Sequence, residues 1–389
     1  MGNESIVFSL FLIFSGAAIM ATLALTVRQS LIIAYIAVGL LIGPSGSGLI
    51  EDPALIQNIS NVGIIFLLFL LGLDLNPKEL IRMAGETTLV TGASSVLLLL
   101  LGYAYAQLFG FSQAESWIIG SALMFSSTII GLKLIPTTVL HHQHTGEIII
   151  SVLLLQDIIA IILLLVLEGS AQPDMSWMSV ARPMLALPLL ALATWLISRY
   201  LLVRLISAFD RIQEYIFLLA IGWCLGVAEA AEWIGLSYEI GAFIAGVSLA
   251  TSPIALFITN SLKPLRDFFL IIFFVTLGAR FDVSVLSQIW LPAVGLCGIA
   301  VLIKPLLYRQ FLRFSKESSG RSTEVGARLG QMSEFSLLMA VLATEMALID
   351  DSVSYLIQFA TLLSFVISST WVVTRYPTPI ALSDRLRRD

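Results

Sequence analysis

Apolar segments of roughly 20 residues alternate with short polar links along the whole chain. A helix needs about 20 apolar residues to cross the hydrocarbon core of a bilayer. We therefore predict an all-α polytopic membrane protein with about 13 transmembrane helices. The approximate limits of the predicted spans are 6–26, 30–48, 57–75, 86–109, 115–137, 146–168, 178–205, 213–232, 236–254, 264–280, 286–312, 324–347 and 352–374.

The composition indicates little mass outside the bilayer. Of 389 residues, 58% are hydrophobic and only 12% are charged, with a mean hydropathy of +0.96, whereas about 25% of a soluble domain is charged. We expect one transmembrane domain over residues 1–389, with no soluble regulatory domain in this chain. The spans contain no metal-ligand spacing and no enzyme motif. We therefore expect neither an enzyme nor a resident metal or cofactor, and no nucleic-acid partner.

Basic residues gather on one side of the predicted topology. The odd-numbered links and the C-terminal tail hold 18 of the 21 Lys and Arg residues, and the even-numbered links hold only Arg182 and Arg280. Cytoplasmic links carry the excess of Lys and Arg in membrane proteins. This asymmetry places the N-terminus outside and the C-terminus in the cytoplasm, in a prokaryotic-type inner membrane.

The chain contains a weak internal repeat. Residues 39–44 resemble residues 241–246, and residues 66–74 resemble residues 272–280, at offsets of 202 and 206 residues. The partners are the second and ninth spans and the third and tenth, so the two halves enter the membrane in opposite directions. Inverted repeats are typical of secondary transporters, whose binding site lies near the midplane at the repeat interface.

One span carries an isolated acid. Within residues 151–167, Asp157 is the only ionisable side chain, and the amide Gln156 precedes it. A carboxylate at membrane depth is costly unless it is hydrated, paired or protonated. We interpret Asp157 as a group that binds a proton or a cation. The alternative is a neutral acid that only forms hydrogen bonds in the core.

Two further spans are polar at their middle. The fifth span has three consecutive hydroxyl residues, Ser126, Ser127 and Thr128, and the twelfth has Ser333 and a second acid, Glu334. Polar interruptions at matching places in two repeats predict broken helices that form a binding site. Their oxygen atoms would replace part of the hydration shell of an alkali ion. Close packing of helices through small residues is the alternative for these positions.

Lys304 lies inside a predicted span and is the one basic residue that belongs to neither set of links nor to the tail. A lysine at that depth needs a partner or must lose its proton. We expect an ion pair inside the helix bundle, with Asp157 and Glu334 as the candidate partners. The alternative is that the side chain reaches the membrane interface.

In this order, the segments resemble the membrane domain of the monovalent cation:proton antiporter-2 family, with the Kef-type potassium efflux antiporters as the nearest group. The resemblance covers almost the whole chain. It is carried by Gly39–Pro44, Phe69–Leu75, Ser126–Thr128, Gln156–Asp157, Gly241–Gly246, Lys304 and Ser333–Phe335. Two positions differ from the family pattern, with Asp for Glu at residue 74 and Ser for Gly at residue 333.

The resemblance implies an inverted-repeat antiporter fold with two crossing broken helices, and a homodimer in the lipid bilayer. A core ion-binding subdomain, about 86–168 and 286–374, would move against a dimerisation subdomain, about 6–75 and 213–280, with a linker helix at about 178–205. Kef proteins carry a cytoplasmic regulatory domain after the last span, whereas this chain ends about 15 residues beyond its last span. A separate regulatory subunit, or a domain missing from this chain, is therefore a candidate partner.

We expect a secondary active transporter that exchanges a monovalent cation for protons by alternating access, with Asp157 as the single carrying carboxylate. Potassium is the favoured cation and sodium the second choice. The expected ion- and proton-binding residues are Asp157, Gln156, Ser126, Ser127, Thr128, Ser333, Glu334 and Lys304. Two other interpretations stay open: a cation channel lined by the same residues, and an ion-coupled symporter of an organic anion on a similar fold.

Overall fold

All elements of the described part of the chain are helices, which confirms the predicted fold class. The computed structural model describes residues 6–27, 29, 31–50, 54–74, 86–135, 144–170, 177–209, 212–250, 252 and 255–378. Within them, 7 helices are long and apolar enough to cross a membrane, and three shorter helices are also apolar. Each predicted span contains helix. Parts of some predicted spans, residues 30, 75, 136–137, 251 and 253–254, lie outside the described residues.

The elements follow one another with short connections. The first half contains α1 (Ile6–Thr26), α2 (Leu31–Ile42), α3 (Ala54–Asp74), α5 (Glu86–Leu108), α6 (Gln113–Met124), α7 (Thr128–Lys133), α9 (His144–Ser170) and α10 (Trp177–Ile197). The second half contains the π-helical segment η1 (Ser198–Leu202), α11 (Val203–Ala208), α12 (Gln213–Trp233), α13 (Tyr238–Ala250), α14 (Ala255–Arg280), the 3₁₀ turn η2 (Val283–Val285), α15 (Leu286–Gly298), the π-helical segment η3 (Ile299–Ile303), α16 (Lys304–Phe314), α17 (Ser319–Arg328), α18 (Glu334–Glu345) and α19 (Asp351–Arg375).

The chain divides into two compact units. The first contains Met1–Met20, Tyr35–Ile81 and Leu165–Arg280, and the second contains Ala21–Ala34, Arg82–Leu164 and Phe281–Asp389. All the predicted site residues belong to the second unit. The predicted linker helix, at about 178–205, lies within the first unit as α10, η1 and the start of α11. The assignment of dimerisation and ion binding to separate subdomains stays a prediction.

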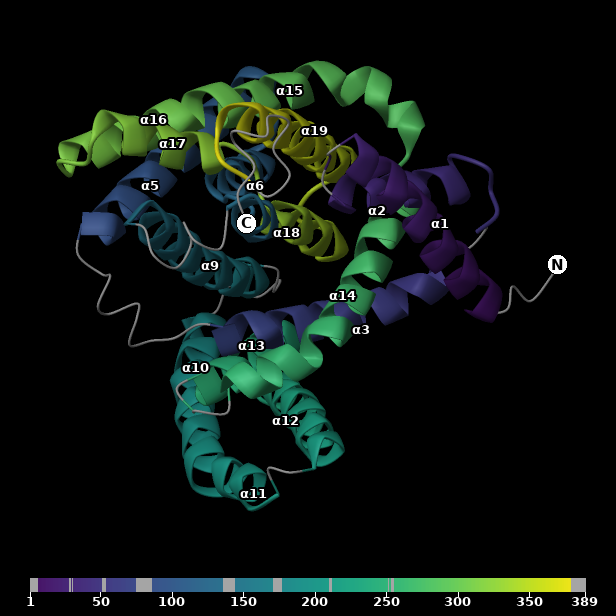
Figure 1. Ribbon diagram of the computed structural model, residues 1–389, viewed down its shortest axis with the longest axis vertical. Coiled ribbons are helices and arrows are strands. Elements are labelled where there is room, and N and C mark those ends of the chain that lie inside the picture. The colour runs from purple at the N-terminus through teal and green to yellow at the C-terminus, as the bar shows by residue number, and fades with distance from the viewer. Residues whose placement is uncertain are drawn as a thin grey trace. The chain divides into compact units, whose positions relative to one another are not determined.

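In the first unit, glycines let helix backbones touch. Helix α3 runs along α13, and α2 lies beside α14 (Figure 1). A Cβ atom on Gly246 of α13 would overlap the carbonyl oxygen of Phe69, and one on Gly39 of α2 would overlap that of Val275. Small residues allow this close packing, which matters because the hydrophobic effect does not drive helices together in lipid. The glycines of the two repeat-related segments thus have the same packing role.

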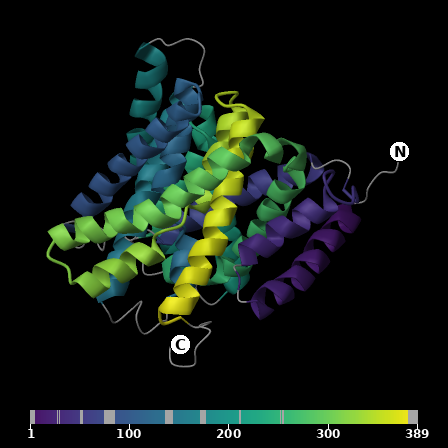
Figure 2. The same ribbon diagram turned by 90° about the horizontal axis from the view of Figure 1, so that it is seen from above.

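In the second unit, α15, η3 and α16 follow one another directly, and α19 crosses them (Figure 2). Pro305 has no N–H to donate and its ring crowds the carbonyl group of the preceding turn. The π-helical segment η3 lies directly before it and accommodates this defect. The chain then turns at Lys316, whose φ is 64°, and α17 returns along α16.

Both predicted broken helices are present. Helix α6 starts with a capping box of Ser112 and Glu115, ends at Met124 and gives way to extended backbone before α7. Helix α17 ends at Arg328 and α18 begins at Glu334, after a non-helical stretch of the intervening residues. The Ser333 hydroxyl accepts a hydrogen bond from the Phe335 N–H and so caps the new helix start.

The glycine contacts predict a sharp difference between two substitutions in the first unit. Gly246→Ala places a methyl group against the α3 backbone, and we expect it to lower the free energy of unfolding by about 1–3 kcal/mol through overpacking. Gly226→Ala is the control, because no atom lies within 4 Å of its added Cβ, and we expect it to be neutral or up to about 1 kcal/mol stabilising. Thermal unfolding in detergent compares them. Equal stability of the two variants would contradict the contact.

Candidate functional site

The two helix breaks meet and hold each other. The Ser126 hydroxyl donates to the carbonyl oxygen of Leu329 at 2.9 Å, and the Ser336 hydroxyl donates to that of Ala122 at 2.6 Å. The Gln331 amide donates to the Ser127 carbonyl oxygen at 3.5 Å. The first and third contacts join residues 203 and 204 positions apart, which matches the offset of the sequence repeat. Positions at or near repeat equivalence therefore contact one another where the helices cross.

Asp157 lies beside these breaks on α9. Its side chain is buried, with 2% of the residue exposed. The Thr128 hydroxyl lies beside its carboxyl group, and Glu334, in the first turn of α18, is close enough to interact with it electrostatically. One oxygen, Oδ2, is buried and has no hydrogen-bond partner among the described residues. The predicted Asp157, Thr128 and Glu334 thus come together as a cluster of oxygen atoms.

Hydrogen bonds of the Gln156 side chain join the first helix break to α9. Its Nε2 donates to the Met124 carbonyl oxygen at 2.8 Å and to the Tyr308 hydroxyl at 2.6 Å. Its Oε1 accepts a hydrogen bond from the Ser126 N–H at 3.0 Å. Both amide protons are therefore used by protein groups. The amide supports the backbone beside Asp157, and its role as an ion ligand stays a prediction.

The remaining hydroxyl residues of the prediction cap helices. Ser127 Oγ accepts a hydrogen bond from the Ile130 N–H at the start of α7, and Ser333 does the same for α18. Both are fully buried. Their side chains satisfy backbone donors that a helix start leaves free, and their carbonyl groups border the two breaks.

The structure corrects the prediction of an ion pair for Lys304. Its Nζ donates to three backbone carbonyl oxygens, those of Leu123 at 3.2 Å, Phe125 at 2.5 Å and Gln331 at 2.9 Å. The predicted ion pair with Asp157 or Glu334 is wrong, since no ion pair of Lys304 occurs among the described residues. The breaks provide the reason: α6 ends at Met124, so carbonyl groups near its negative end lack helical partners. They satisfy the ammonium group in place of a carboxylate.

Tyr308 also contacts the site and is absent from the predicted residues. It is fully buried, although it carries a hydroxyl group. It lies four residues after Lys304 in α16, so both side chains point to the same side of that helix. An aromatic residue with a polar group at that spacing from an intramembrane lysine is the signal that was available.

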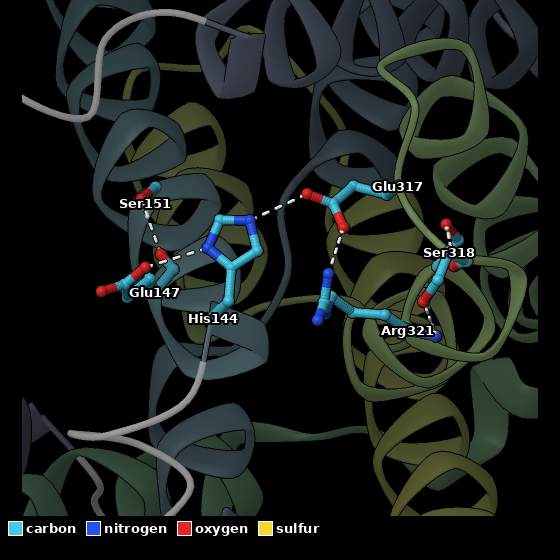
Figure 3. Close-up of polar contacts among 7 residues, drawn as sticks. His144, Glu147, Ser151, Glu317, Ser318 and Arg321 are labelled. Atoms are coloured by element: carbon cyan, nitrogen blue, oxygen red, sulfur yellow. Dashed lines mark hydrogen bonds and ion pairs between the residues drawn. The ribbon is translucent and has the colours of Figure 1, made fainter.

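A polar cluster joins the start of α9 to the turn before α17 (Figure 3). His144 contacts Glu147 through Nδ1 at 2.9 Å and Glu317 through Nε2 at 2.8 Å, and Arg321 contacts the other oxygen of Glu317 at 2.7 Å. Partial burial alone would raise the pKa of Glu317. The hydrogen bonds from Arg321 and His144 outweigh burial, so this pKa lies below its ordinary value. The cluster holds the end of the Asp157 helix to the element that precedes the second break.

The carbonyl contacts of Lys304 predict a large cost of removing its charge. Lys304→Gln has at most two donors for three carbonyl groups, and we expect the free energy of unfolding to fall by about 2–4 kcal/mol. The control is Lys263→Gln, at an exposed lysine whose Nζ donates to Asn260 Oδ1, with an expected change within about 0.5 kcal/mol. Thermal unfolding in detergent measures both. A Lys304→Gln variant as stable as the control would refute the structural role of the ammonium group.

The chain is similar to transporters from bacteria and a plant. It is 27% identical over 352 residues to the iron transporter MagA of Paramagnetospirillum magneticum, covering 89% of this chain and 80% of MagA. It is 28% identical to the putative cation/proton antiporter YbaL of Escherichia coli, covering 90% of this chain and 65% of YbaL. It is also 28% identical to K(+) efflux antiporter 6 of Arabidopsis thaliana, covering 87% of this chain and 58% of that protein.

The fold has a solved counterpart. The structure of the sodium proton antiporter MjNhaP1 from Methanocaldococcus jannaschii matches with a TM-score of 0.68 and 17% sequence identity, over 94% of this chain and 96% of the other. At that identity the match supports the fold. The sequence of this chain matches the family described as sodium/hydrogen exchanger, transmembrane, over residues 12–375. The chain therefore belongs to this family of membrane-embedded cation/proton antiporters, which are transporters and not enzymes.

Proposed function

We propose that the chain exchanges a monovalent cation for protons, with Asp157 as the one carboxylate that carries either. Potassium is the favoured cation, supported by the resemblance to Kef-type proteins and by the name of the plant relative, a K(+) efflux antiporter. Sodium is the second choice, because the structural counterpart is a sodium proton antiporter. Membership of an antiporter family favours exchange over the channel and symporter interpretations.

The observation that carries the proposal is the buried oxygen of Asp157. Oδ2 has no hydrogen-bond partner among the described residues, and an unsatisfied carboxylate oxygen in a medium without water is costly. A proton or a bare monovalent cation removes that cost. The Thr128 hydroxyl and the Glu334 carboxylate lie close by and supply further oxygen ligands of the kind that hard cations prefer.

Competition for Asp157 produces the exchange. The carboxylate is neutralised by a proton or by a cation, and the two states carry equal charge. The ionised and empty site is the costly state, so movement between the two sides of the membrane is favoured only when the site is loaded. Each ligand therefore returns in place of the other, and no bound cofactor takes part.

The contacts of Lys304 support electroneutral exchange. A protonated lysine has three N–H donors, and three carbonyl oxygens accept hydrogen bonds from Nζ. None of these acceptors is the carboxylate that titrates. The ammonium group therefore has no partner to lose when the cation binds Asp157, and it keeps its proton through the cycle. One positive charge then leaves for each one that enters.

We further propose a homodimer in a prokaryotic-type inner membrane, with the second compact unit moving as the ion-carrying core. The chain spans only 65% of the length of YbaL and 58% of the length of the plant antiporter. A regulatory domain or subunit on the cytoplasmic side fits that difference in length. The excess of basic residues in the odd-numbered links supports an external N-terminus and a cytoplasmic C-terminus.

Orientation can be tested by labelling with an impermeant thiol reagent. Gly320→Cys lies in an odd-numbered link and we expect labelling from the cytoplasm, whereas Asp350→Cys lies in an even-numbered link and we expect labelling from outside. Both positions are exposed, and the native Cys224 and Cys297 are buried and give little background. Labelling of both variants from one side would refute the proposed topology.

The carrier role predicts the outcome of substitutions at the acids. Asp157→Asn keeps the shape but cannot ionise, and we expect loss of exchange with normal expression. Asp351→Asn, at an exposed acid of the same unit, is the control and keeps native exchange. Dye-based proton flux in proteoliposomes with potassium, sodium, lithium or rubidium measures exchange, beside electrophysiology on solid-supported membranes. We expect the native protein to show flux without transport-scaled currents.

Three results separate the parts of this proposal. Near-native exchange by Asp157→Asn refutes the carrier role. Loss of exchange in Glu334→Gln as complete as that in Asp157→Asn makes the pair of acids the carrier in place of one. Robust currents that scale with transport and vanish in Asp157→Asn overturn electroneutral exchange.

A further inference from the structure

We propose that Tyr308 is a positioning residue for cation binding, which acts through Gln156 to hold the first helix break against the helix that carries Asp157. This inference rests on the proposed function, in which Asp157 binds the cation. Tyr308 lies on α16, and its hydrogen-bond partners among the described residues do not include Asp157. Its influence on the site therefore depends on the groups between them.

The first step is the amide of Gln156. Its side chain has three groups with which to form hydrogen bonds, two N–H donors and one oxygen, and each has a protein partner. One donor meets Met124 at the end of α6, the oxygen meets the N–H of Ser126 in the break, and the other donor meets Tyr308. The Tyr308 hydroxyl is thus the only one of the three partners that comes from outside the first broken helix. It sets which way the amide faces.

The second step is the direction of the hydrogen bonds. The Tyr308 oxygen accepts from Gln156 Nε2, so its own proton is free to be donated. The hydroxyl groups of Ser94 and Ser126 lie beside it, and one of them can accept this proton. Each of these serines donates its own proton onward, Ser94 to the Thr91 carbonyl oxygen and Ser126 to that of Leu329. Hydrogen bonds arranged in series strengthen one another in a medium of low dielectric constant.

The third step connects this series of hydrogen bonds to the ion site. Ser126 is two residues before Thr128, whose hydroxyl lies beside the Asp157 carboxyl group. Gln156 is the residue directly before Asp157. The side chain of Gln156, which Tyr308 orients, thus fixes the position of the first break relative to the Asp157 carboxylate. Without that hydrogen bond, Thr128 loses its fixed distance from Asp157, and cation binding weakens before the fold does.

The test is Tyr308→Phe, which keeps the ring and removes the hydroxyl. We expect the cation KM to rise roughly three- to tenfold, as for the loss of one buried hydrogen bond, with the maximal rate within about twofold of native. The matched control is Tyr105→Phe in the same unit, where the hydroxyl donates to the Pro292 carbonyl oxygen at 2.8 Å, away from the predicted site residues. We expect a comparable loss of thermal stability there and a native KM.

A double-mutant cycle separates positioning from simple packing. If Tyr308 acts through Gln156, then adding Tyr308→Phe to Gln156→Leu leaves the KM of that variant unchanged. The same fold increase in both backgrounds would overturn the proposal, and so would a native KM in Tyr308→Phe. If Tyr308→Phe is not recovered folded, a fluorinated tyrosine at 308 keeps the hydroxyl but makes its oxygen a poorer acceptor. An unchanged KM in that variant also overturns the proposal.

Failure of the positioning role and failure of the carrier role give different results. Exchange by Asp157→Asn would refute the proposed function whatever the behaviour of Tyr308→Phe. An inactive Asp157→Asn beside a Tyr308→Phe variant of native KM would refute only the positioning role.

Discussion

Two helices that stop partway through the bilayer leave carbonyl groups without partners in a medium that contains no water to replace them. The ammonium group of Lys304 satisfies three of these carbonyl groups, from both breaks at once. Its position depends in turn on the π-helical segment before Pro305, which sets where α16 begins. Together with the hydrogen bonds that Gln156, Ser126 and Ser336 donate, these contacts stabilise the unwound backbone at the Asp157 site.

The same constraint explains why a neutral residue precedes the acid. Gln156 donates two hydrogen bonds and accepts one, and its two acceptor partners include a backbone carbonyl oxygen that cannot donate in return. An aspartate at this position would be shorter and would have no N–H group. The neutral amide is part of the support of the site, and its lack of charge is a consequence of that role.

The fold and the location of the site could be predicted from sequence because both depend on local patterns. Span length, the offset of the repeat and the polar interruptions at Ser126–Thr128 and Ser333–Glu334 are visible in the chain itself. The partner of Lys304 could not be predicted, because its acceptors are backbone groups that exist only once the helices break. A sequence shows charges but not unpaired carbonyl groups. Tyr308 was missed for a related reason: in an apolar helix an aromatic ring suggests packing, and its hydroxyl partner lies 152 residues away.

The internal repeat, which pairs positions at the crossing of the two breaks, does not extend to the charged residues there. The offsets of 202 and 206 pair Lys304 with residues 98–102, which read Leu-Leu-Leu-Leu-Gly, and pair Asp157 with residues 359–363, which contain no acid. The first half thus supplies Asp157, and the second half supplies the ammonium group of Lys304, which contacts backbone carbonyl groups of both breaks. Two identical halves would place two lysines and two acids at the crossing, and these charges would neutralise each other. The backbone of the crossing thus follows the internal repeat, whereas the side chains of Lys304 and Asp157 do not.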